Sequence, residues 1–138
     1  MKELQEKLAG LDALVSARLG GLMVSMRPIE GEVPVVEVTI EGREELPIFV
    51  TCAKPQVLCI VYLWGEDEVK PGQRLAMLET MLDLNVPIPL SCFGRIGQRY
   101  VLSGALRPNA SVHDIAEDVA VLSDNSLDAL SALADFLI

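Results

Sequence analysis

Eight consecutive residues, Val57 to Trp64, carry no charge and are almost all apolar. A run of this length that is rich in β-branched and aromatic residues is typical of a buried strand. A strand with one face in water alternates apolar and polar side chains, and this run does not alternate. We therefore expect a strand that is covered on both faces.

The length and composition of the chain favour one domain, residues 1–138, built around that strand. Hydrophobic residues make up 51% of the chain and aromatic residues only 4%, so the core is expected to consist of aliphatic and methionine side chains. No linker, internal repeat or low-complexity segment divides the sequence.

The periodicity of apolar residues predicts the remaining elements. They are a helix over 2–19, strands over 22–27, 36–40, 48–52 and 57–64, a helix over 73–84, a hairpin over 88–103, and a helical tail that Ser111 caps. This order, α-β-β-β(-β)-α-β-β-α, predicts an α+β fold with an antiparallel sheet of about five or six strands and helices packed on it. Two points stay open: whether residues 47–64 form one strand or two, and whether the last helix breaks near Asn125.

Local signals define the ends of several elements. Gly94–Gly97 is expected to form the turn of the hairpin, and Pro87 and Pro89 suit an edge strand because proline cannot donate to a strand ladder. The G-x-x-G pattern of this turn also occurs in nucleic-acid-binding loops, but there it joins two helices rather than two strands.

The charge of the chain disfavours several classes of partner. Twenty acidic residues against eleven basic ones give a net charge of −9, which repels phosphate backbones and anionic lipid. No apolar run is long enough to span a bilayer and no signal sequence is evident, so we expect a cytoplasmic protein that binds neither nucleic acid nor membrane. The cysteines, Cys52, Cys59 and Cys92, lack C-x-x-C spacing and suit a reducing compartment.

No catalytic, cofactor or metal site is predicted. His113 is the single histidine, and its neighbours Ser111 and Asp114 are better explained as helix-capping residues than as members of a triad. One histidine and three scattered cysteines do not match the spacing of zinc ligands. The acidic run Glu66–Glu68 is interpreted as a solvated turn, since it lacks the spacing of a calcium loop.

Two surfaces are predicted to bind other molecules. The helix over 73–84 has one stripe of Leu75, Leu78 and Leu82 and another of Met77, Met81 and Leu84. A helix that is apolar on most sides needs cover on most sides, and methionine suits adaptable contacts. We therefore predict that Met77, Met81 and Leu84 form a symmetric dimer contact or a partner contact. The alternative is a monomer in which the C-terminal helix covers this surface.

The second predicted surface is a basic patch of Arg95, Arg99 and Arg107, which are three of the eleven basic residues. The hypothesis is that this patch contacts an acidic segment of a partner protein. The alternative is that the three arginines are separate surface charges that aid solubility.

Four segments carry a resemblance to known proteins: Leu46–Val50, Val57–Trp64, Pro87–Leu106 and Ser111–Ile115. In their order they resemble the type III secretion chaperone-like fold, which includes the secretion chaperones and the YbjN-type proteins of bacteria. Within that fold the chain most resembles the YjfI-like bacterial family of unknown function. The resemblance implies a homodimer with a protein-binding role rather than an enzyme, and it brings no functional residues.

Together these observations favour a non-enzymatic cytosolic protein-binding domain, adaptor or chaperone-like, that forms a homodimer and binds an unidentified partner. The alternative is a small-ligand-binding protein or an enzyme with a pocket between sheet and helices. Convergent polar groups on the inward face would favour that alternative.

Overall fold

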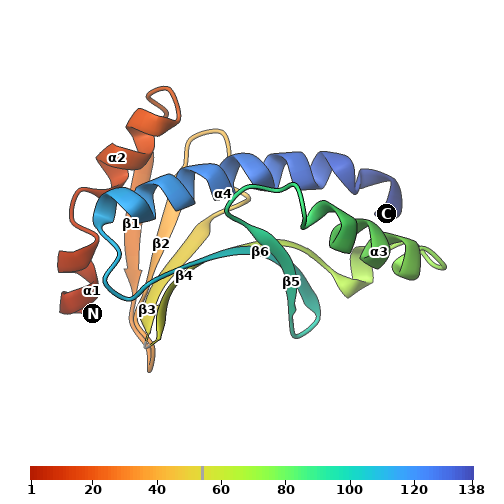
Figure 1. Cartoon of the computed structure of the whole chain (residues 1–138), viewed down its shortest axis with the longest axis horizontal. Helices are drawn as coiled ribbons and strands as arrows, with labels where there is room; N and C mark the ends of the chain where they lie inside the picture. The colour runs from red at the N-terminus through yellow and green to blue at the C-terminus, as the bar shows by residue number, and fades with distance from the viewer. Residues whose placement is uncertain (54) are drawn as a thin grey trace.

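The apolar run that begins at Val57 lies within β4 (Gln56–Gly65), in the middle of a six-stranded antiparallel sheet of order β1-β2-β3-β4-β6-β5 (Figure 1). The computed structural model describes residues 1–53 and 55–138. The other strands are β1 (Val24–Ile29), β2 (Val35–Ile40), β3 (Ile48–Ala53), β5 (Cys92–Ile96) and β6 (Arg99–Leu106). The predicted α+β fold with an antiparallel sheet is therefore confirmed.

Residues 47–64 form two strands rather than one. β3 and β4 pair antiparallel, with Val50 opposite Cys59. The interruption expected at residues 54–55 falls partly on residue 54, which lies outside the described residues.

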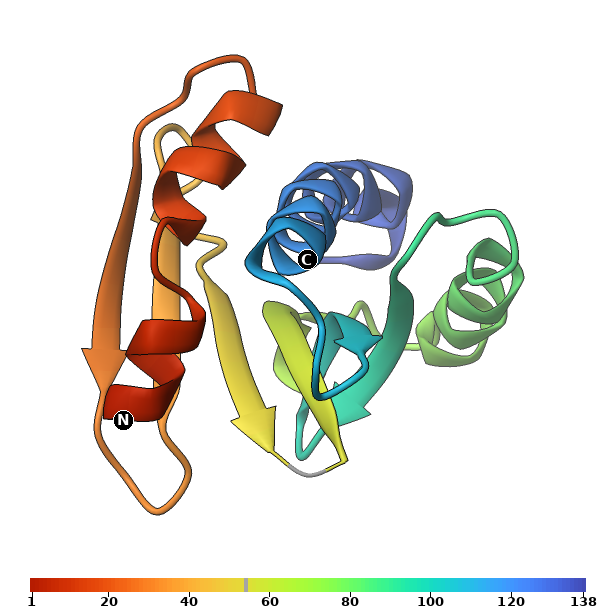
Figure 2. The ribbon, with the colours of Figure 1, turned by 60° about the vertical axis from the view of Figure 1, so that its left-hand side comes forward.

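The helices gather on one face of the sheet (Figure 2). They are α1 (Lys2–Lys7), α2 (Leu11–Arg18), α3 (Arg74–Leu84) and α4 (Val112–Ala132), with short 3-10 turns η1 (Glu66–Glu68) and η2 (Ala134–Phe136). α4 crosses β4 and β6 and packs against α2, and α3 stands near the β5 edge. The main core lies between α4 and the inward side chains of β4, which are Val57, Cys59 and Val61.

The opposite face of β4 has no helix over it among the described residues. Its side chains, which include Ile60 and Tyr62, are half-buried by their neighbours on β3 and β6. The ring of Phe49 packs edge-on against Tyr62, with 5.9 Å between the ring centroids. Within this chain the strand is thus covered by a helix on one face only, and on the other face large side chains of adjacent strands shield one another. Cover of that second face by another molecule stays a prediction.

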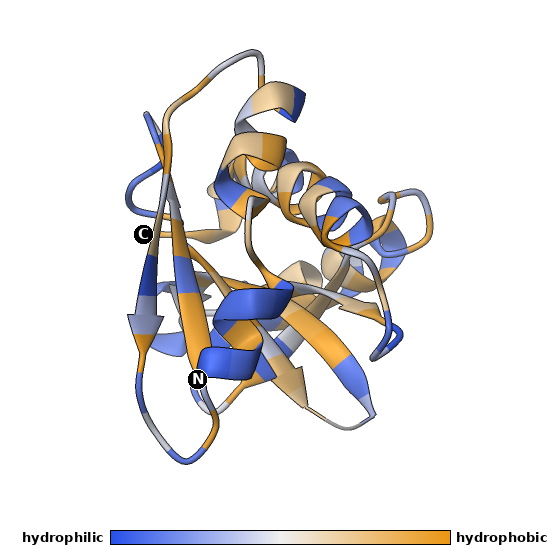
Figure 3. Cartoon of the chain, turned by 90° about the vertical axis from the view of Figure 1, so that its left-hand side faces the viewer, coloured by the Kyte–Doolittle hydropathy of each residue, from blue (hydrophilic) through white to orange (hydrophobic). Residues whose placement is uncertain are grey.

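The helix predicted over 2–19 is two helices, separated at Gly10. α1 ends at Lys7, and Gly10, which has φ 83° and a left-handed conformation, is the residue that precedes α2. α1 is mostly hydrophilic (Figure 3) and buries only Leu4, whereas α2 buries Leu11 and Val15. The apolar stripe is continuous in space because the break leaves these side chains on the same side.

The hairpin also differs from its prediction. Ile96 pairs with Arg99, so the turn is Gly97-Gln98, and Gly94 lies within β5. Gly97 has φ 60°, which supplies the turn geometry that Gly94 was expected to supply. The two prolines precede β5 rather than lie in it, and β5 is an edge strand as predicted.

α4 is continuous through Asn125, so the break considered for that position does not occur. Ser111 caps its start by accepting a hydrogen bond from the Asp114 amide at 3.1 Å. The Asn125 side chain donates to the carbonyl of Pro89 at 2.9 Å and to the hydroxyl of Ser91 at 3.0 Å. This polar stretch of α4 therefore anchors the loop that leads into β5.

Candidate protein-binding surface

α3 presents an exposed apolar face that begins at Leu75. Leu75 is 70% exposed and Leu82 is 67% exposed. Leu78 lies between them at helical spacing, and Val86 follows directly after the helix. We call these four residues, Leu75, Leu78, Leu82 and Val86, the leucine surface. Water-exposed leucines at regular spacing are typical of a helix face that another protein covers.

A cluster of charged and polar side chains holds the start of α3 in place. Glu66 accepts hydrogen bonds from the Tyr100 hydroxyl and, at 3.0 Å, from Nε of Arg74, the first residue of α3. Nε of Arg95 lies 3.3 Å from the same carboxylate. These hydrogen bonds keep the pKa of Glu66 below its usual range, and the bond from Tyr100 has the larger effect, ahead of the bond from Arg74. One carboxylate thus connects η1, α3, β5 and β6.

The other end of the helix is fixed to the edge of the sheet. The amide N–H of Phe93 in β5 donates to Oδ1 of Asn85 at 2.6 Å. A slot of about 260 Å³ lies between α3 and the edge strand, with Leu78, Leu82, Phe93 and Tyr100 among its lining residues. α3 therefore covers part of the β5 edge, which would otherwise expose unpaired backbone groups.

The residues predicted for the dimer contact lie on the other side of α3. Met77 and Met81 are buried in the core, and Leu84 is half-buried. In the folded chain the predicted stripe therefore packs inward, and the stripe of Leu75 and Leu82 is the exposed one. The sequence does not distinguish the two stripes because both are apolar, and a dimer contact on this helix stays a prediction. The contacts of Glu66 and Asn85 at the two ends of the helix are consistent with the orientation that buries Met77 and Met81.

The three arginines of the predicted basic patch do not lie together. Arg95 pairs with Tyr100 across the hairpin and reaches Glu66 on the helix-covered face. Arg99, adjacent to Tyr100 in β6, points to the opposite face, where its guanidinium lies 5.3 Å from the centre of the Tyr62 ring. Arg107 follows the far end of β6, roughly 25 Å along the strand from Arg99. Alternation along the strand and its length therefore separate these charges.

A second feature, absent from the sequence predictions, is the buried carboxylate of Asp118. Asp118 is only 5% exposed and lies on the face of α4 that packs on the sheet. Below it, Gly104 of β6 pairs with Cys59 of β4. A Cβ at Gly104 would overlap the carboxylate, so the glycine makes room for it. Oδ2 of Asp118 has no hydrogen-bond partner among the described residues.

Burial sets the acidity of this pair of groups. Loss of solvation raises the pKa of Asp118 to about 6, against a smaller opposing effect of the hydrogen bond from Cys59. Burial is the main cause, and the charge of Asp118 the second cause, that raises the pKa of the Cys59 thiol well above its usual value. Cys59 is therefore a neutral thiol at physiological pH rather than a nucleophile.

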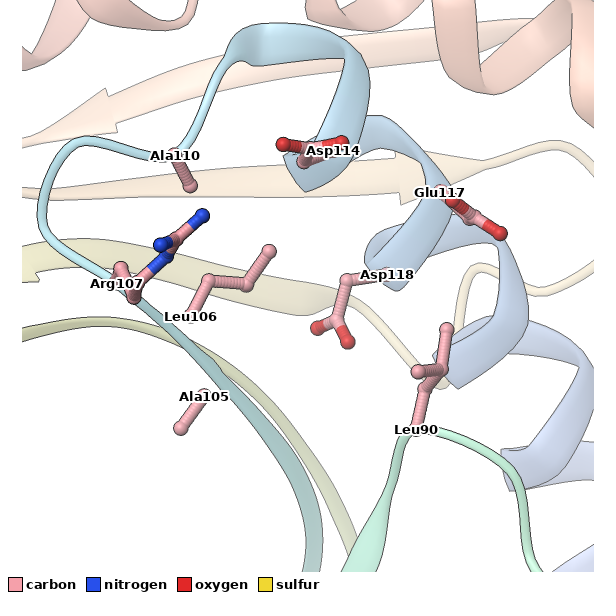
Figure 4. Close-up of a pocket in the computed structure, with 8 residues that line it drawn as sticks. All are labelled: Leu90, Ala105, Leu106, Arg107, Ala110, Asp114, Glu117 and Asp118. Carbon is pink, nitrogen blue, oxygen red and sulfur yellow. The ribbon is translucent and has the colours of Figure 1, made fainter.

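Asp118 lines an open cavity of about 460 Å³ between α4 and the end of β6 (Figure 4). Its other lining residues are Leu90, Ala105, Leu106, Arg107, Ala110, Asp114 and Glu117. One signal in the sequence points to Asp118: it occupies the apolar stripe of the last helix, three residues after Ile115 and four before Leu122. A carboxylate at such a position faces the core.

The other polar candidates remain dispersed over the described part of the chain. There, no group of three or more His, Cys, Asp or Glu side chains is placed to hold a metal ion. His113 is on the first turn of α4, beside the capping residue Ser111 and not in the Asp118 cavity. Of the helices that the structure describes, none combines the length and apolarity needed to cross a bilayer.

The fold is similar to that of two chains in solved structures. The chain superposes with a TM-score of 0.53 on a chain of the heterodimeric ExoU–SpcU complex from the type III secretion system of Pseudomonas aeruginosa, at 15% identity, covering 90% of this chain and 98% of that one. A chain of the ExsC–ExsE complex gives a TM-score of 0.50 at 15% identity, covering 94% and 96%. The fold is thus the type III secretion chaperone-like fold that the sequence predicted.

The chain belongs to a bacterial family described as "Uncharacterized protein conserved in bacteria (DUF2170)", which matches residues 1–137. The expectation of a bacterial family of unknown function is therefore confirmed. No curated protein matches the chain by sequence.

Proposed function

We propose that this chain is a non-enzymatic protein-binding domain, adaptor or chaperone-like in role, that forms a homodimer through the leucine surface of α3. The observation that carries the proposal is the clustering of exposed apolar side chains. Among the described residues nine large apolar side chains are exposed, and five of them fall between residues 75 and 96. Those five are Leu75, Leu82, Val86, Leu90 and Ile96.

Energetics favour a dimer that dissociates on dilution. A symmetric contact buries Leu75 and Leu82 of both copies, at roughly 1.5–3 kcal/mol for each leucine. Association costs roughly 4–15 kcal/mol in lost freedom of motion, so the four leucines offset that cost without a large surplus. The fraction of dimer should therefore rise with protein concentration and fall on dilution.

The structural neighbours support a binding role. Both neighbours come from complexes of two different proteins, one of them described as heterodimeric. In this chain the uncovered face of the sheet and the leucine surface are separate, so a homodimer through α3 leaves the sheet face free for a different partner.

The test compares two double variants by light scattering and sedimentation across a wide range of protein concentrations. Leu75→Asp/Leu82→Asp places charges on the leucine surface. Met23→Asp/Val33→Asp is the matched control, since Met23 is 76% and Val33 53% exposed at the β1 end of the molecule. We expect the wild type and the control to dimerise with rising concentration and the leucine variant to stay monomeric. A wild type that is monomeric throughout would contradict the proposal.

Binding of a different protein needs its own measurement. Tagged wild-type protein and both double variants are incubated with lysate of the native bacterium, and captured proteins are compared. We expect one dominant partner that the wild type and the Met23/Val33 control retain. A folded wild type that captures nothing would contradict the adaptor role and leave the homodimer as a separate question.

A second candidate function, binding of a small ligand, is favoured by a different observation. The cavity beside Asp118 lies between sheet and helix, as the alternative from the sequence required, and it contains a buried carboxylate without a full set of partners. Neither the dimer nor the capture experiment tests this site.

A further inference from the structure

The cavity at Asp118 is built around an incompletely paired carboxylate. Figure 4 shows this side chain projecting from α4 between Leu90 and Leu106. Oδ2 of Asp118 has no hydrogen-bond partner among the described residues, and the neighbouring Cys59 thiol, which lowers the pKa of Asp118, is at best a weak donor. A buried carboxylate that lacks strong donors destabilises the fold, because it has lost its hydration without compensation. A cation bound in the cavity beside Asp118 would offset the charge of this carboxylate.

The charged residues around the cavity favour a positively charged ligand. Three carboxylates, those of Asp114, Glu117 and Asp118, line it together with one guanidinium, that of Arg107. The chain as a whole carries −9, which adds to the negative potential at this site. An anionic ligand is therefore disfavoured. A metal ion is disfavoured as well, because these carboxylates do not converge into a ligand set among the described residues.

The apolar residues that line the rest of the cavity favour a particular kind of cation. Leu90, Ala105, Leu106 and Ala110 give the cavity apolar sides that lead to the carboxylate. Such a site fits a cation on an alkyl chain, since a methylene stem packs on apolar surface while its charged end pairs with a carboxylate. We propose that this cavity binds an alkylammonium group, carried by a free alkylamine or by a lysine side chain of a partner polypeptide, with Asp118 as its counter-ion.

Arg107 modulates this site rather than occupying it. Its guanidinium points toward Ala110 and the first turn of α4, not toward Asp118 (Figure 4), and it forms no ion pair with the carboxylates of the described residues. Its positive charge opposes the entry of a second cation. Arg107→Ala should therefore strengthen alkylammonium binding.

The experiment titrates ¹⁵N-labelled protein with pentylamine and follows amide chemical shifts. We expect saturable shifts centred on Asp118, Gly104 and Ala105. Asp118→Asn should weaken binding by about tenfold or more, because it removes the charge from an ionic hydrogen bond. Asp128→Asn is the matched control: Asp128 is an exposed carboxylate on the same helix, and its loss removes the same charge. Pentanol, which has the alkyl chain without the charge, should not bind.

A parallel titration distinguishes the two sources of the ammonium group. Nα-acetyl-lysine methylamide that binds as tightly as pentylamine identifies a lysine side chain, whereas binding of the free amine alone identifies a small amine. The proposal is overturned if Asp118→Asn binds pentylamine as the wild type does, if pentanol shifts the same amides, or if the shifts spread evenly over the acidic surface. A folded Asp118→Asn variant is expected, since asparagine keeps the side-chain shape. The result is independent of the leucine surface, because the titration needs neither a dimer nor a partner.

Discussion

Oδ1 of Asn85, at the end of α3, accepts a hydrogen bond of 2.6 Å from the backbone amide of Phe93 in the edge strand. This contact joins a helix to the outer edge of the sheet through a side chain rather than through packing alone. Together with the contact between Glu66 and Arg74 at the other end of α3, it fixes the position of the leucine surface.

Asn85→Ala should loosen the end of α3. Loss of the hydrogen bond leaves the Phe93 amide unpaired and should reduce the free energy of unfolding by about 1 kcal/mol. Hydrogen exchange at the Phe93 amide should accelerate more than exchange in β3 and β4. Asn85→Asp, which keeps the acceptor, should leave Phe93 protected. Equal protection of Phe93 in the alanine variant would show that Asn85 does not close the edge.

Glu66→Gln should weaken the other attachment of α3 in a pH-dependent way. The folded protein lowers the pKa of Glu66, so this carboxylate stabilises the fold above its unfolded pKa, and that contribution is lost as the pH falls through the folded value. The variant should therefore be less stable than the wild type at neutral pH, and the difference should shrink in acid. Thermal denaturation at a series of pH values measures this, with Glu79→Gln, an exposed residue of α3, as control. A difference that does not change with pH would contradict the role of the charge.

Asp118→Asn should have the opposite pH dependence. The folded pKa of Asp118 is raised from 3.8 to about 6, so its ionisation destabilises the fold progressively as the pH rises through that interval. Compared with the wild type, the variant should gain about 2 kcal/mol between pH 4 and neutrality, after allowance for solvent screening. The groups that face Asp118 are Cys59 from β4 and, around the cavity, Asp114, Glu117 and Arg107.

Denaturant unfolding at several pH values checks the Asp118 prediction, and the ¹³C carboxyl resonance of Asp118 reports its pKa directly. Asp128→Asn is again the control. A wild type and an Asp118→Asn variant with parallel stability profiles would show that Asp118 is not a buried acid.

Gly104→Ala should destabilise the protein because the added methyl group meets the Asp118 carboxylate. Overpacking of this kind costs roughly 1–3 kcal/mol. The double variant Gly104→Ala/Asp118→Ala should recover much of that loss, since the smaller side chain on α4 makes room for the methyl group. A double-variant cycle without coupling between the two sites would contradict the contact.

The sequence predicted the fold because its strongest signals are local and consistent with one another. The apolar run at 57–64, the N-cap at Ser111 and the stripe of the last helix all lie where they were expected. The predicted turn and the predicted first helix were wrong in detail, because two local signals compete at each place. Gly94 and Gly97 both suit a turn, and strand pairing alone assigns Gly97 to it. Likewise, Gly10 interrupts a helix whose apolar stripe continues past it.

The candidate surfaces were harder to predict than the fold, because they depend on the tertiary orientation of helices and strands. Both stripes of α3 consist of large apolar residues. The sequence therefore indicates that the helix is apolar on most sides, but it does not indicate which side faces the core. The three arginines are close in sequence, yet strand alternation places Arg95 and Arg99 on opposite faces. Asp118 could have been recognised from its position between Ile115 and Leu122, but the glycine beneath it is revealed only by the pairing of β4 with β6.

The attachment of α3 has a consequence for how the molecule opens. Its two ends are held by hydrogen bonds that Nε of Arg74 donates to Glu66 and the Phe93 amide donates to Asn85, and two of its side chains, Met77 and Met81, reach the core. By contrast, α4 buries ten residues along its length. A helix held in this way can detach as one cooperative unit at a lower free energy than global unfolding. Such a detachment would expose Met77 and Met81 together with the leucines and convert a narrow helix face into a broad, adaptable apolar platform. In such a detached state both apolar stripes of α3 would face outward, whereas the leucine surface alone does so in the folded structure.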